Sequence, residues 1–300
     1  MIYPEDGDIK MRARRALLYV PGDDRHKIEK AAGLNADCIC LDLEDGVSVT
    51  HKQAARQEII TCLKEIEFGS SERLVRVNSI SSSLCADELR AIIPAKPDGI
   101  FLPKVSDASQ VTWISAEIEK LEKQENIEVG SLPLLVGIES ALGILHLNEI
   151  CQASPRLSAL VFGAEDYISD IGGMKSDDPS GILYARSAVV THSAAYNLQA
   201  IDMVCTEYKN EELLVKEARF GMAMGYTGKQ VIHPAQVAPV QKAFIPDAVM
   251  LEQARRILQA YQEQQAFGKG AFAVDGKMVD MPVVKSAERL VARADFFKDH

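Results

Sequence analysis

Short runs of apolar residues alternate with longer segments of helical period along most of the chain. The runs are rich in Val, Ile and Leu, and polar residues follow where each run ends. This composition is typical of parallel strands that are buried on both faces. The pattern predicts eight strands: Ala16–Val20, Cys38–Leu43, Leu74–Val77, Gly99–Leu102, Leu134–Ile138, Ala159–Phe162, Ala200–Val204 and Gln230–Ile232.

Segments with helical periodicity lie between these strands. They include Lys52–Glu65, Ala108–Lys123, Ala141–Ile150, Tyr184–Tyr196 and Glu211–Met224. A (β/α)8 barrel typically needs about 250 residues, which suits this alternation. A doubly wound open sheet is the alternative, but it usually has fewer strands and a Gly-rich first turn, and the G-x-G-x-x-G pattern is absent here. We therefore predict an α/β fold with a (β/α)8 TIM barrel in residues 1–245.

The chain continues beyond the predicted barrel in residues 246–300. Apolar spacing predicts helices at Leu251–Gln265 and Val284–Phe296. The segment Phe267–Pro282 between them is Gly-rich and predicts a loop or a short hairpin around Asp275-Gly276. We expect this C-terminal extension to act as a lid or as an arm between subunits.

Composition excludes several classes of protein. The chain of 300 residues has 33 Lys and Arg against 43 Asp and Glu, a formal net charge of −10, with no basic stripe for nucleic acid. No apolar stretch approaches the roughly 20 residues of a membrane span. Residues 1–10 resemble neither a signal peptide nor a transit sequence. The six cysteines are spaced irregularly, which does not indicate a disulfide framework and favours reduced thiols. We therefore predict a cytoplasmic protein with no nucleic-acid or membrane partner.

Charged side chains gather at the ends of the predicted strands. The carboxyl ends of barrel strands form one rim, where the active sites of this fold lie. Any one of these residues could instead cap a helix or form a salt bridge. Crowded carboxylates repel one another unless a cation is present, and oxygen ligands suit Mg2+ or Mn2+. The strand-end residues are Asp42, Glu44, Asp45, Arg76, Asn78, Lys104, Glu139, Glu165, Asp166, Asp202 and His233.

Two of these residues have alternative interpretations. Lys104 could form a Schiff base, or it could serve as a rim salt bridge or substrate contact. His233 could be a general base or a hydrogen-bonded histidine beside a ligand. The H-E-x-x-H, G-x-S-x-G and C-x-x-C patterns are absent, so zinc hydrolases, esterases with a nucleophile elbow and thiol redox enzymes lose their main support.

Six short motifs at successive strand ends resemble those of the HpcH/HpaI aldolase and citrate lyase β-subunit superfamily. The closing segments Gly268–Phe272 and Val279–Pro282 are similar to its branch of lyases for citramalyl-CoA and malyl-CoA. We expect the chain to differ from mitochondrial members in lacking a transit sequence. The six motifs are Leu18-Tyr-Val-Pro-Gly22, Leu41-Asp-Leu-Glu-Asp-Gly-Val47, Arg76-Val-Asn78, Leu102-Pro-Lys104, Gly163-Ala-Glu-Asp166 and Gly228-Lys-Gln-Val-Ile-His-Pro234.

This resemblance implies a Mg2+-dependent retro-aldol cleavage of a 3-hydroxyacyl-CoA with a second carboxylate. The reaction expected is the cleavage of (3S)-citramalyl-CoA to acetyl-CoA and pyruvate. Alternatives are a malyl-CoA or β-methylmalyl-CoA lyase, with or without malate synthase activity, and the β subunit of a citryl-carrier-protein lyase. A non-catalytic CoA-binding protein is a further alternative, against which the complete set of matching residues argues.

The resemblance also assigns roles to residues at the rim. Glu139 and Asp166 match the metal ligands, with Mn2+ as a possible replacement for Mg2+. Two carboxylates on neighbouring strands can share one octahedral ion and leave positions for water and substrate. Arg76 matches the substrate arginine, whose planar fork suits a carboxylate or a developing oxyanion. Glu44 and Asp45 are expected to hold metal-bound water.

Further roles implied by the resemblance lie outside this cluster. Asp280 matches an acid/base aspartate that a neighbouring subunit supplies, most simply in a homotrimer. Residues expected to contact CoA are Tyr19, His26 and Lys30, and His26 stands where relatives have a lysine. Ile232 and His233 are expected to line the thioester end.

Overall fold

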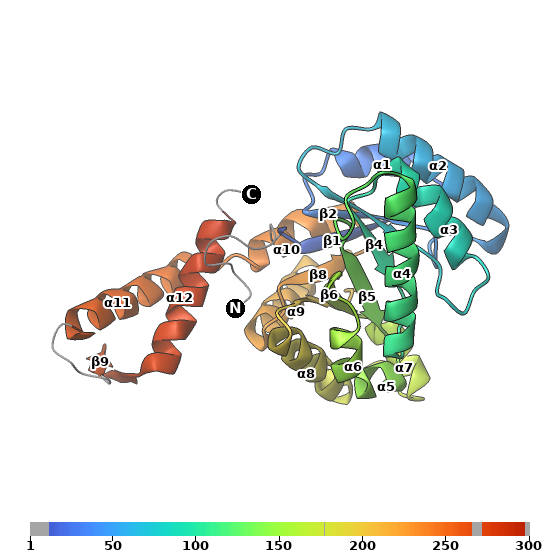
Figure 1. Cartoon of the computed structure of the whole chain (residues 1–300). Helices are drawn as coiled ribbons and strands as arrows, with labels where there is room; N and C mark the ends of the chain where they lie inside the picture. Colours follow the sequence, from blue (N-terminus) through green and yellow to red (C-terminus); the bar gives the residue numbers. More distant parts are fainter. Residues whose placement is uncertain (1–11, 177, 266–271, 298–300) are drawn as a thin grey trace. The chain divides into compact units, whose positions relative to one another are not determined.

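The computed structural model describes residues 12–176, 178–265 and 272–297 (Figure 1). The chain divides into two units. One comprises Arg14–Gln241, and the other includes Lys242 and the described residues after it. The sequence predicted a boundary a few residues later, after residue 245. Residues 1–10 and Gly268–Ala271, which entered the sequence interpretation, lie outside the described residues.

Eight parallel strands close into a barrel in sequence order, with β8 paired to β1. This closure confirms the predicted (β/α)8 barrel, because a doubly wound sheet would leave two open edges. Figure 1 shows the helices surrounding this sheet. The strands are β1 Ala16–Pro21, β2 Cys38–Asp42, β3 Glu72–Arg76, β4 Gly99–Leu102, β5 Leu134–Ile138, β6 Leu157–Phe162, β7 Gln199–Asp202 and β8 Gly228–Val231.

The five segments predicted to be helical between the strands contain helices, although one of them is divided and α8 begins at Ser180, before the predicted Tyr184. The single helix expected at Ala141–Ile150 is two short helices that meet at His146, whose Nδ1 lies 2.9 Å from the Ser106 carbonyl oxygen. None of the described helices has the length and apolarity that crossing a membrane requires. The barrel helices are α1 Arg25–Ala32, α2 Lys52–Glu65, α3 Cys85–Ile92, α4 Ala108–Gln124, α5 Ala141–Leu145, α6 Leu147–Gln152, α7 Ala164–Asp170, α8 Ser180–Ala195, α9 Glu211–Met224 and α10 Val237–Ala243, with 3-10 turns η1 Val49–His51, η2 Ile93–Ala95 and η3 Pro234–Gln236.

Local sequence signals explain where individual helices begin and end. Asp107 and Gln110 form a capping box at the start of α4: the Asp107 side chain accepts the N–H groups of Ser109 and Gln110, and the Gln110 side chain accepts the N–H of Asp107. Asn210 caps α9 by accepting the N–H of Leu213, and Gly225 ends that helix in the left-handed conformation, with φ +111°. These caps satisfy backbone groups that a helix terminus leaves unpaired.

The interior of the barrel is filled by alternate side chains of its strands. Successive residues of a strand face opposite sides, so every second residue points inward. Tyr19 packs against this interior cluster on the side of the carboxyl ends. The cluster comprises Leu17, Cys38, Cys40, Leu74, Phe101, Leu135, Ala159, Val161 and Ile201, all buried. The cysteines among them are free thiols.

A buried ion pair closes the opposite, amino-terminal end of the barrel. The guanidinium of Arg14 donates to both carboxylate oxygens of Glu72, at 2.6 and 2.7 Å. The same guanidinium donates to Ser158 and Gln199 through Nη1, so four of its five N–H groups have these partners. A buried pair of this kind needs such additional hydrogen bonds to offset its desolvation. This end of the barrel is therefore neutralised and filled.

The C-terminal unit contains α11 (Ala248–Gln265), the hairpin strands β9 (Phe272–Val274) and β10 (Lys277–Val279), and α12 (Met281–Phe296). The hairpin turns at Asp275-Gly276, as the sequence predicted, with positive φ at both residues. Asp280 is the N-cap of α12 and accepts the N–H of Val283 at 3.4 Å. This aspartate therefore has a structural role in addition to any chemical one.

Candidate active site

The strand alternation that fills the barrel also directs polar side chains into its carboxyl-terminal mouth. Cys40 points inward, so Asp42, two residues later on β2, points inward one layer higher. Leu74 and Arg76 are related in the same way on β3. Apolar residues therefore form the barrel interior and polar residues its mouth, on the same face of each strand.

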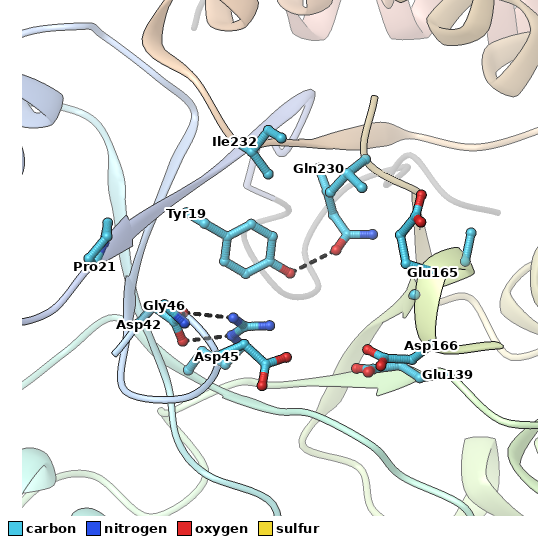
Figure 2. Close-up of a pocket in the computed structure, with 14 residues that line it drawn as sticks. Tyr19, Pro21, Asp42, Asp45, Gly46, Glu139, Glu165, Asp166, Gln230 and Ile232 are labelled. Atoms are coloured by element: carbon cyan, nitrogen blue, oxygen red, sulfur yellow. Dashed lines mark hydrogen bonds and ion pairs between the residues drawn. The ribbon is translucent and has the colours of Figure 1, made fainter. Parts of the chain in front are cut away.

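These side chains surround a cavity of about 400 Å³ at the carboxyl ends of the strands (Figure 2). One side of it is acidic, and the other presents mainly apolar and aromatic groups. A cavity in which polar groups converge beside an apolar wall is typical of a small-molecule site. Its lining residues are Tyr19, Pro21, Asp42, Asp45, Gly46, Arg76, Glu139, Gly163, Ala164, Glu165, Asp166, Val204, Gln230 and Ile232.

The planar guanidinium group of Arg76 is held along one edge by Asp42 and on one face by Tyr19. Its Nε and Nη2 donate to the two carboxylate oxygens of Asp42, both at 2.7 Å, and its guanidinium lies 4.6 Å from the ring centroid of Tyr19. Burial alone would lower the pKa of Arg76, but the hydrogen bonds with Asp42 and the nearby negative charges raise it. Arg76 is therefore a fixed cation, and Asp42 leaves N–H groups on Nη1 and Nη2 unused.

Glu44 links Arg76 to Lys104. One Glu44 oxygen lies 3.2 Å from Arg76 Nη1, and the other accepts Lys104 Nζ at 2.5 Å. Burial raises the pKa of Glu44, whereas these two cations oppose the rise. Burial would lower the pKa of Lys104, but the Glu44 contact raises it. A Schiff base needs a neutral amine, so these ion pairs argue against that interpretation of Lys104.

Asp45, beside Glu44, is the exposed carboxylate of this group. It lies 3.4 Å from Lys104 Nζ, and its side chain is 62% exposed. Burial would raise the pKa of Asp45, but the hydrogen bond with Glu44 and the charges of Lys104 and Arg76 lower it. Asp45 therefore presents an ionised carboxylate to the cavity.

Glu139 and Asp166 form a second acidic group, in which Figure 2 shows the carboxyl groups side by side. Glu139 follows β5, and Asp166 lies in the first turn of α7. Burial, followed by the hydrogen bond with Asp166, raises the pKa of Glu139 to about 8. A Cβ on Gly137 would lie 2.2 Å from Glu139 Oε1, and one on Gly163 would lie 2.5 Å from Glu139 Cγ. Glycine at both positions therefore makes room for this carboxylate.

The carboxylate pair fits a hard divalent cation. Two adjacent carboxylates in a partly buried site repel each other, and a cation removes that repulsion. No cluster of three or more His, Cys, Asp or Glu suited to a metal occurs in the described part of the chain. Mg2+ is commonly bound through one or two carboxylates, with water and substrate completing its octahedron. The donor set therefore suits Mg2+ better than a metal that prefers nitrogen or sulfur.

Sequence reasoning missed Gln230 as a site residue. Its side-chain NH2 donates to the carbonyl oxygens of Phe162 and Asp202, at 2.8 and 3.0 Å. Its Oε1 therefore faces the Tyr19 hydroxyl, which donates to it at 2.8 Å (Figure 2). The available signal was its place on β8 in the inward-facing row. Asp42 was missed as the partner of Arg76, although it stands at the end of β2.

The predicted CoA-contacting residues lie in different places. Tyr19 and Ile232 line the cavity. His26 and Lys30 are exposed on α1, and neither lines the cavity. His233 caps η3 through its Nδ1, which accepts the N–H of Ala235 at 3.2 Å. This hydrogen bond makes Nδ1 an acceptor, and His233 is not among the cavity-lining residues.

Two polar residues expected at the rim point elsewhere. Asp202 lies on the outward-facing row of β7, where its carboxylate accepts from Arg186 Nε and Nη2 in a buried pair. Asn78 donates to Glu88 and to the Leu43 carbonyl, beneath the loop that follows β2. The expectation was therefore wrong for Asp202, because a residue at a strand end can face either side, and Asn78 is not among the residues that line the cavity.

A model of the HpcH/HpaI aldolase/citrate lyase family matches residues 15–234. The chain belongs to this family. Human mitochondrial citramalyl-CoA lyase is 38% identical over 307 residues, covering 99% of this chain and 90% of that protein. The citrate lyase subunit beta of Leuconostoc mesenteroides subsp. cremoris is 33% identical over 284 residues, covering 95% and 94%. CitE from Mycobacterium tuberculosis, solved with magnesium, acetoacetate and coenzyme A, is 31% identical with a TM-score of 0.78, covering 94% and 98%.

These comparisons confirm the family that the strand-end motifs indicated, and the barrel is the fold shared with CitE. The human relative is named as mitochondrial. The cytoplasmic location expected of this chain stays a prediction.

The glycine beside Glu139 provides a test of the metal site. Gly163→Ala places a methyl group against the Glu139 side chain, so we expect Mg2+ affinity to fall by about 10- to 100-fold, the scale seen when the support of a ligand is lost. Calorimetric titration with Mg2+ measures this. Gly181→Ala is the matched control, because no atom lies within 4 Å of its added Cβ. Unchanged affinity in Gly163→Ala would contradict the assignment of Glu139.

Proposed function

We propose that the protein is a Mg2+-dependent carbon–carbon lyase that cleaves (3S)-citramalyl-CoA to acetyl-CoA and pyruvate. The observation behind this proposal is that Arg76 and the Glu139–Asp166 pair face one cavity. A guanidinium suits a substrate carboxylate, and a carboxylate pair suits the cation that the reaction needs. The human relative named citramalyl-CoA lyase, matched over nearly the whole chain, supports the choice of substrate.

Retro-aldol cleavage sets the chemical demands on the site. The bond that breaks joins the hydroxyl-bearing carbon to the methylene next to the thioester. The hydroxyl loses its proton and becomes the carbonyl of pyruvate, while the electron pair of the broken bond forms the acetyl-CoA enolate. Protonation of the enolate carbon then gives acetyl-CoA. The site must therefore bind a carboxylate, stabilise negative oxygen, accept a proton and return one.

Residues of the cavity meet the first two demands. Glu139 and Asp166 would hold Mg2+, which would supply the positive charge that stabilises negative substrate oxygens. Arg76 binds a negatively charged substrate oxygen through the N–H groups that Asp42 leaves free. Because Tyr19, Asp42 and Glu44 together hold the guanidinium, little reorganisation is needed when the substrate arrives.

The two acidic residues after β2 divide their roles. Glu44 is committed to Arg76 and Lys104, and so holds those cations in place. Asp45 is exposed and lines the cavity, and we assign it to holding a water molecule near the carboxylate pair. This assignment revises the equal roles that the sequence suggested for them.

Asp280 is assigned to the proton transfer at the enolate carbon. In this proposal it reaches the barrel mouth of a neighbouring subunit in a homotrimer. Its carboxylate sits at the N-terminus of α12, where the helix dipole favours negative charge. An ionised aspartate can accept a proton in one step and return it in another.

CoA is assigned to the sector of the barrel around β1 and β8, which are neighbouring strands. His26 and Lys30 lie one turn apart on the exposed face of α1, and we assign them to the phosphates of CoA. Ile232 and His233, directly after β8, are assigned to the thioester end. Tyr19 lies between these groups on β1 and lines the cavity.

Close alternatives share this chemistry. A malyl-CoA or β-methylmalyl-CoA lyase would need a pocket that differs by a methyl group, worth about 1–3 kcal/mol. The citrate lyase β subunit that is 33% identical favours a second candidate, in which the thioester is borne by a carrier protein.

A panel of thioesters tests the reaction. With citramalyl-CoA and Mg2+ we expect equal amounts of acetyl-CoA and pyruvate, no activity after chelation, and recovery on adding Mg2+ or Mn2+. Glyoxylate from malyl-CoA at a higher kcat/KM would change the assigned substrate, and activity confined to a citryl carrier protein would support the second candidate. Activity that survives chelation, with borohydride trapping of substrate on Lys104, would contradict the mechanism.

Arg76→Lys tests the guanidinium. Lysine keeps the charge but loses the fork that contacts Asp42 and the substrate together, so we expect kcat to fall by about 100-fold, the scale of a lost oxyanion donor. Arg73→Lys is the matched control on the same strand, because Arg73 pairs with Asp98 instead. Steady-state kinetics of both variants measure the effect. Near-normal turnover in Arg76→Lys would make Arg76 a structural residue.

Asp280→Asn tests the shared site. Asparagine also caps helices, so we expect this variant to fold and to bind Mg2+ and CoA, yet to be nearly inactive. Co-expression with Arg76→Ala should restore part of the activity, because mixed assemblies contain sites with both groups intact. Asp275→Asn, in the hairpin turn, is the control and should stay active. A fully active monomer, or purified mixed assemblies without activity, would refute the shared site.

A further inference from the structure

Lys104 has a backbone conformation that its residue type disfavours. Its φ is +56°, in the left-handed region, where a side chain is crowded by its own backbone. Asparagine and aspartate tolerate this region better than lysine. The described non-glycine residues that adopt it are Asn35, Lys96, Lys104, Asn126, Asn197 and Asp275. Lys104 alone in that set contacts the residues of the cavity mouth.

In this conformation the backbone N–H of Lys104 contacts one acidic group and its ammonium contacts the other. Its backbone N–H donates to Glu139 Oε1 at 3.2 Å, while its ammonium donates to Glu44 Oε1 at 2.5 Å. The second oxygen of Glu44 lies 3.2 Å from Arg76 Nη1. Glu139, Lys104, Glu44 and Arg76 therefore form a continuous chain of contacts from the carboxylate pair to the guanidinium.

The arrangement is poorly explained as a device for stability. The Lys104 side chain is 39% exposed, and the buried Glu44 carboxylate already has a second cation, Arg76, to offset its charge. The left-handed backbone disfavours the folded state further. Backbone strain at the mouth of a cavity indicates a functional constraint.

We propose that Lys104 is a positioning residue that holds Glu44 and, through Glu44, fixes the guanidinium of Arg76 in the orientation that binds the substrate oxygen. The inference rests on the proposed function in that Arg76 binds a substrate carboxylate or oxyanion. Lys104 itself does not touch the reacting atoms. Its ammonium acts on Glu44, and its backbone N–H acts on Glu139.

Two substitutions separate the ammonium from the backbone. Lys104→Met removes the charge and keeps a long side chain, whereas Lys104→Gly also relieves the left-handed strain. Both keep the backbone N–H that donates to Glu139. The matched controls are Lys96→Met and Lys96→Gly, because Lys96 has the same φ of +56° but precedes β4, at the other end of the strand.

We expect both Lys104 variants to lose about 10- to 100-fold in kcat, the scale for residues that orient a site residue. The melting temperature of Lys104→Gly should equal or exceed that of the native protein. Because n-butylammonium matches the side chain that glycine lacks, it should partly restore kcat in Lys104→Gly. Neither Lys96 variant should lose activity or respond to the amine.

Binding of acetoacetate in the presence of Mg2+, measured by calorimetry, gives a readout that does not need turnover. We expect its Kd to rise about 10-fold in Lys104→Met and to stay unchanged in Lys96→Met. If the native protein cleaves no thioester of the panel, the proposed function is wrong, and this Kd alone decides the role of Lys104. Two results would overturn the proposal. One is a kcat and a Kd in Lys104→Met equal to those of the native protein. The other is a fall in the kcat of Lys104→Gly that is explained by unfolding and that n-butylammonium does not reverse.

Discussion

Asp42 and Arg76 lie directly opposite each other on the neighbouring strands β2 and β3, and their side chains form a bidentate ion pair. The same Asp42 carboxylate accepts the backbone N–H groups of Glu44 and Gly46, which shapes the loop after β2. A Cβ on Gly46 would lie 2.5 Å from Asp42 Oδ2, so this position needs glycine. The Asp42 pair thus holds the Nε edge of Arg76 and places Glu44, which contacts Nη1, at the cavity.

The two ends of the barrel differ in whether their charged side chains are balanced. At the amino-terminal end, Arg14 and Glu72 neutralise each other through two hydrogen bonds, and Arg14 also donates to Ser158 and Gln199. At the mouth, carboxylates outnumber the cations Arg76 and Lys104, which are already paired. The pKa of Glu139 is raised to about 8, first by burial and then by Asp166. The excess negative charge at the mouth favours binding of a divalent cation. At the amino-terminal end the charges are paired, which limits the cost of burying them in the folded protein.

Strand alternation explains which rim residues could be foreseen. Arg76 ends β3 and Glu139 follows β5, on the same faces as the interior residues Leu74 and Leu135, and both were expected at the site. Asp202 also stands at a strand end, but it lies on the outward-facing row and pairs with Arg186 beneath the helices. Its exclusion depends on the register of β7 in the closed sheet. A short apolar strand does not reveal that register, because both of its faces are buried.

The sequence alone determined the alternation of strands and helices, the hairpin at Asp275-Gly276 and the family to which the strand-end motifs point. These features follow from local periodicity, turn chemistry and short contiguous motifs, all of which lie within a few residues of one another. The tertiary structure decided that Gln230 holds Tyr19, that Asp42 holds Arg76, and that Lys104 adopts a left-handed conformation. Each depends on barrel closure, which places atoms from distant parts of the chain within hydrogen-bonding distance, and no local pattern encodes such distances.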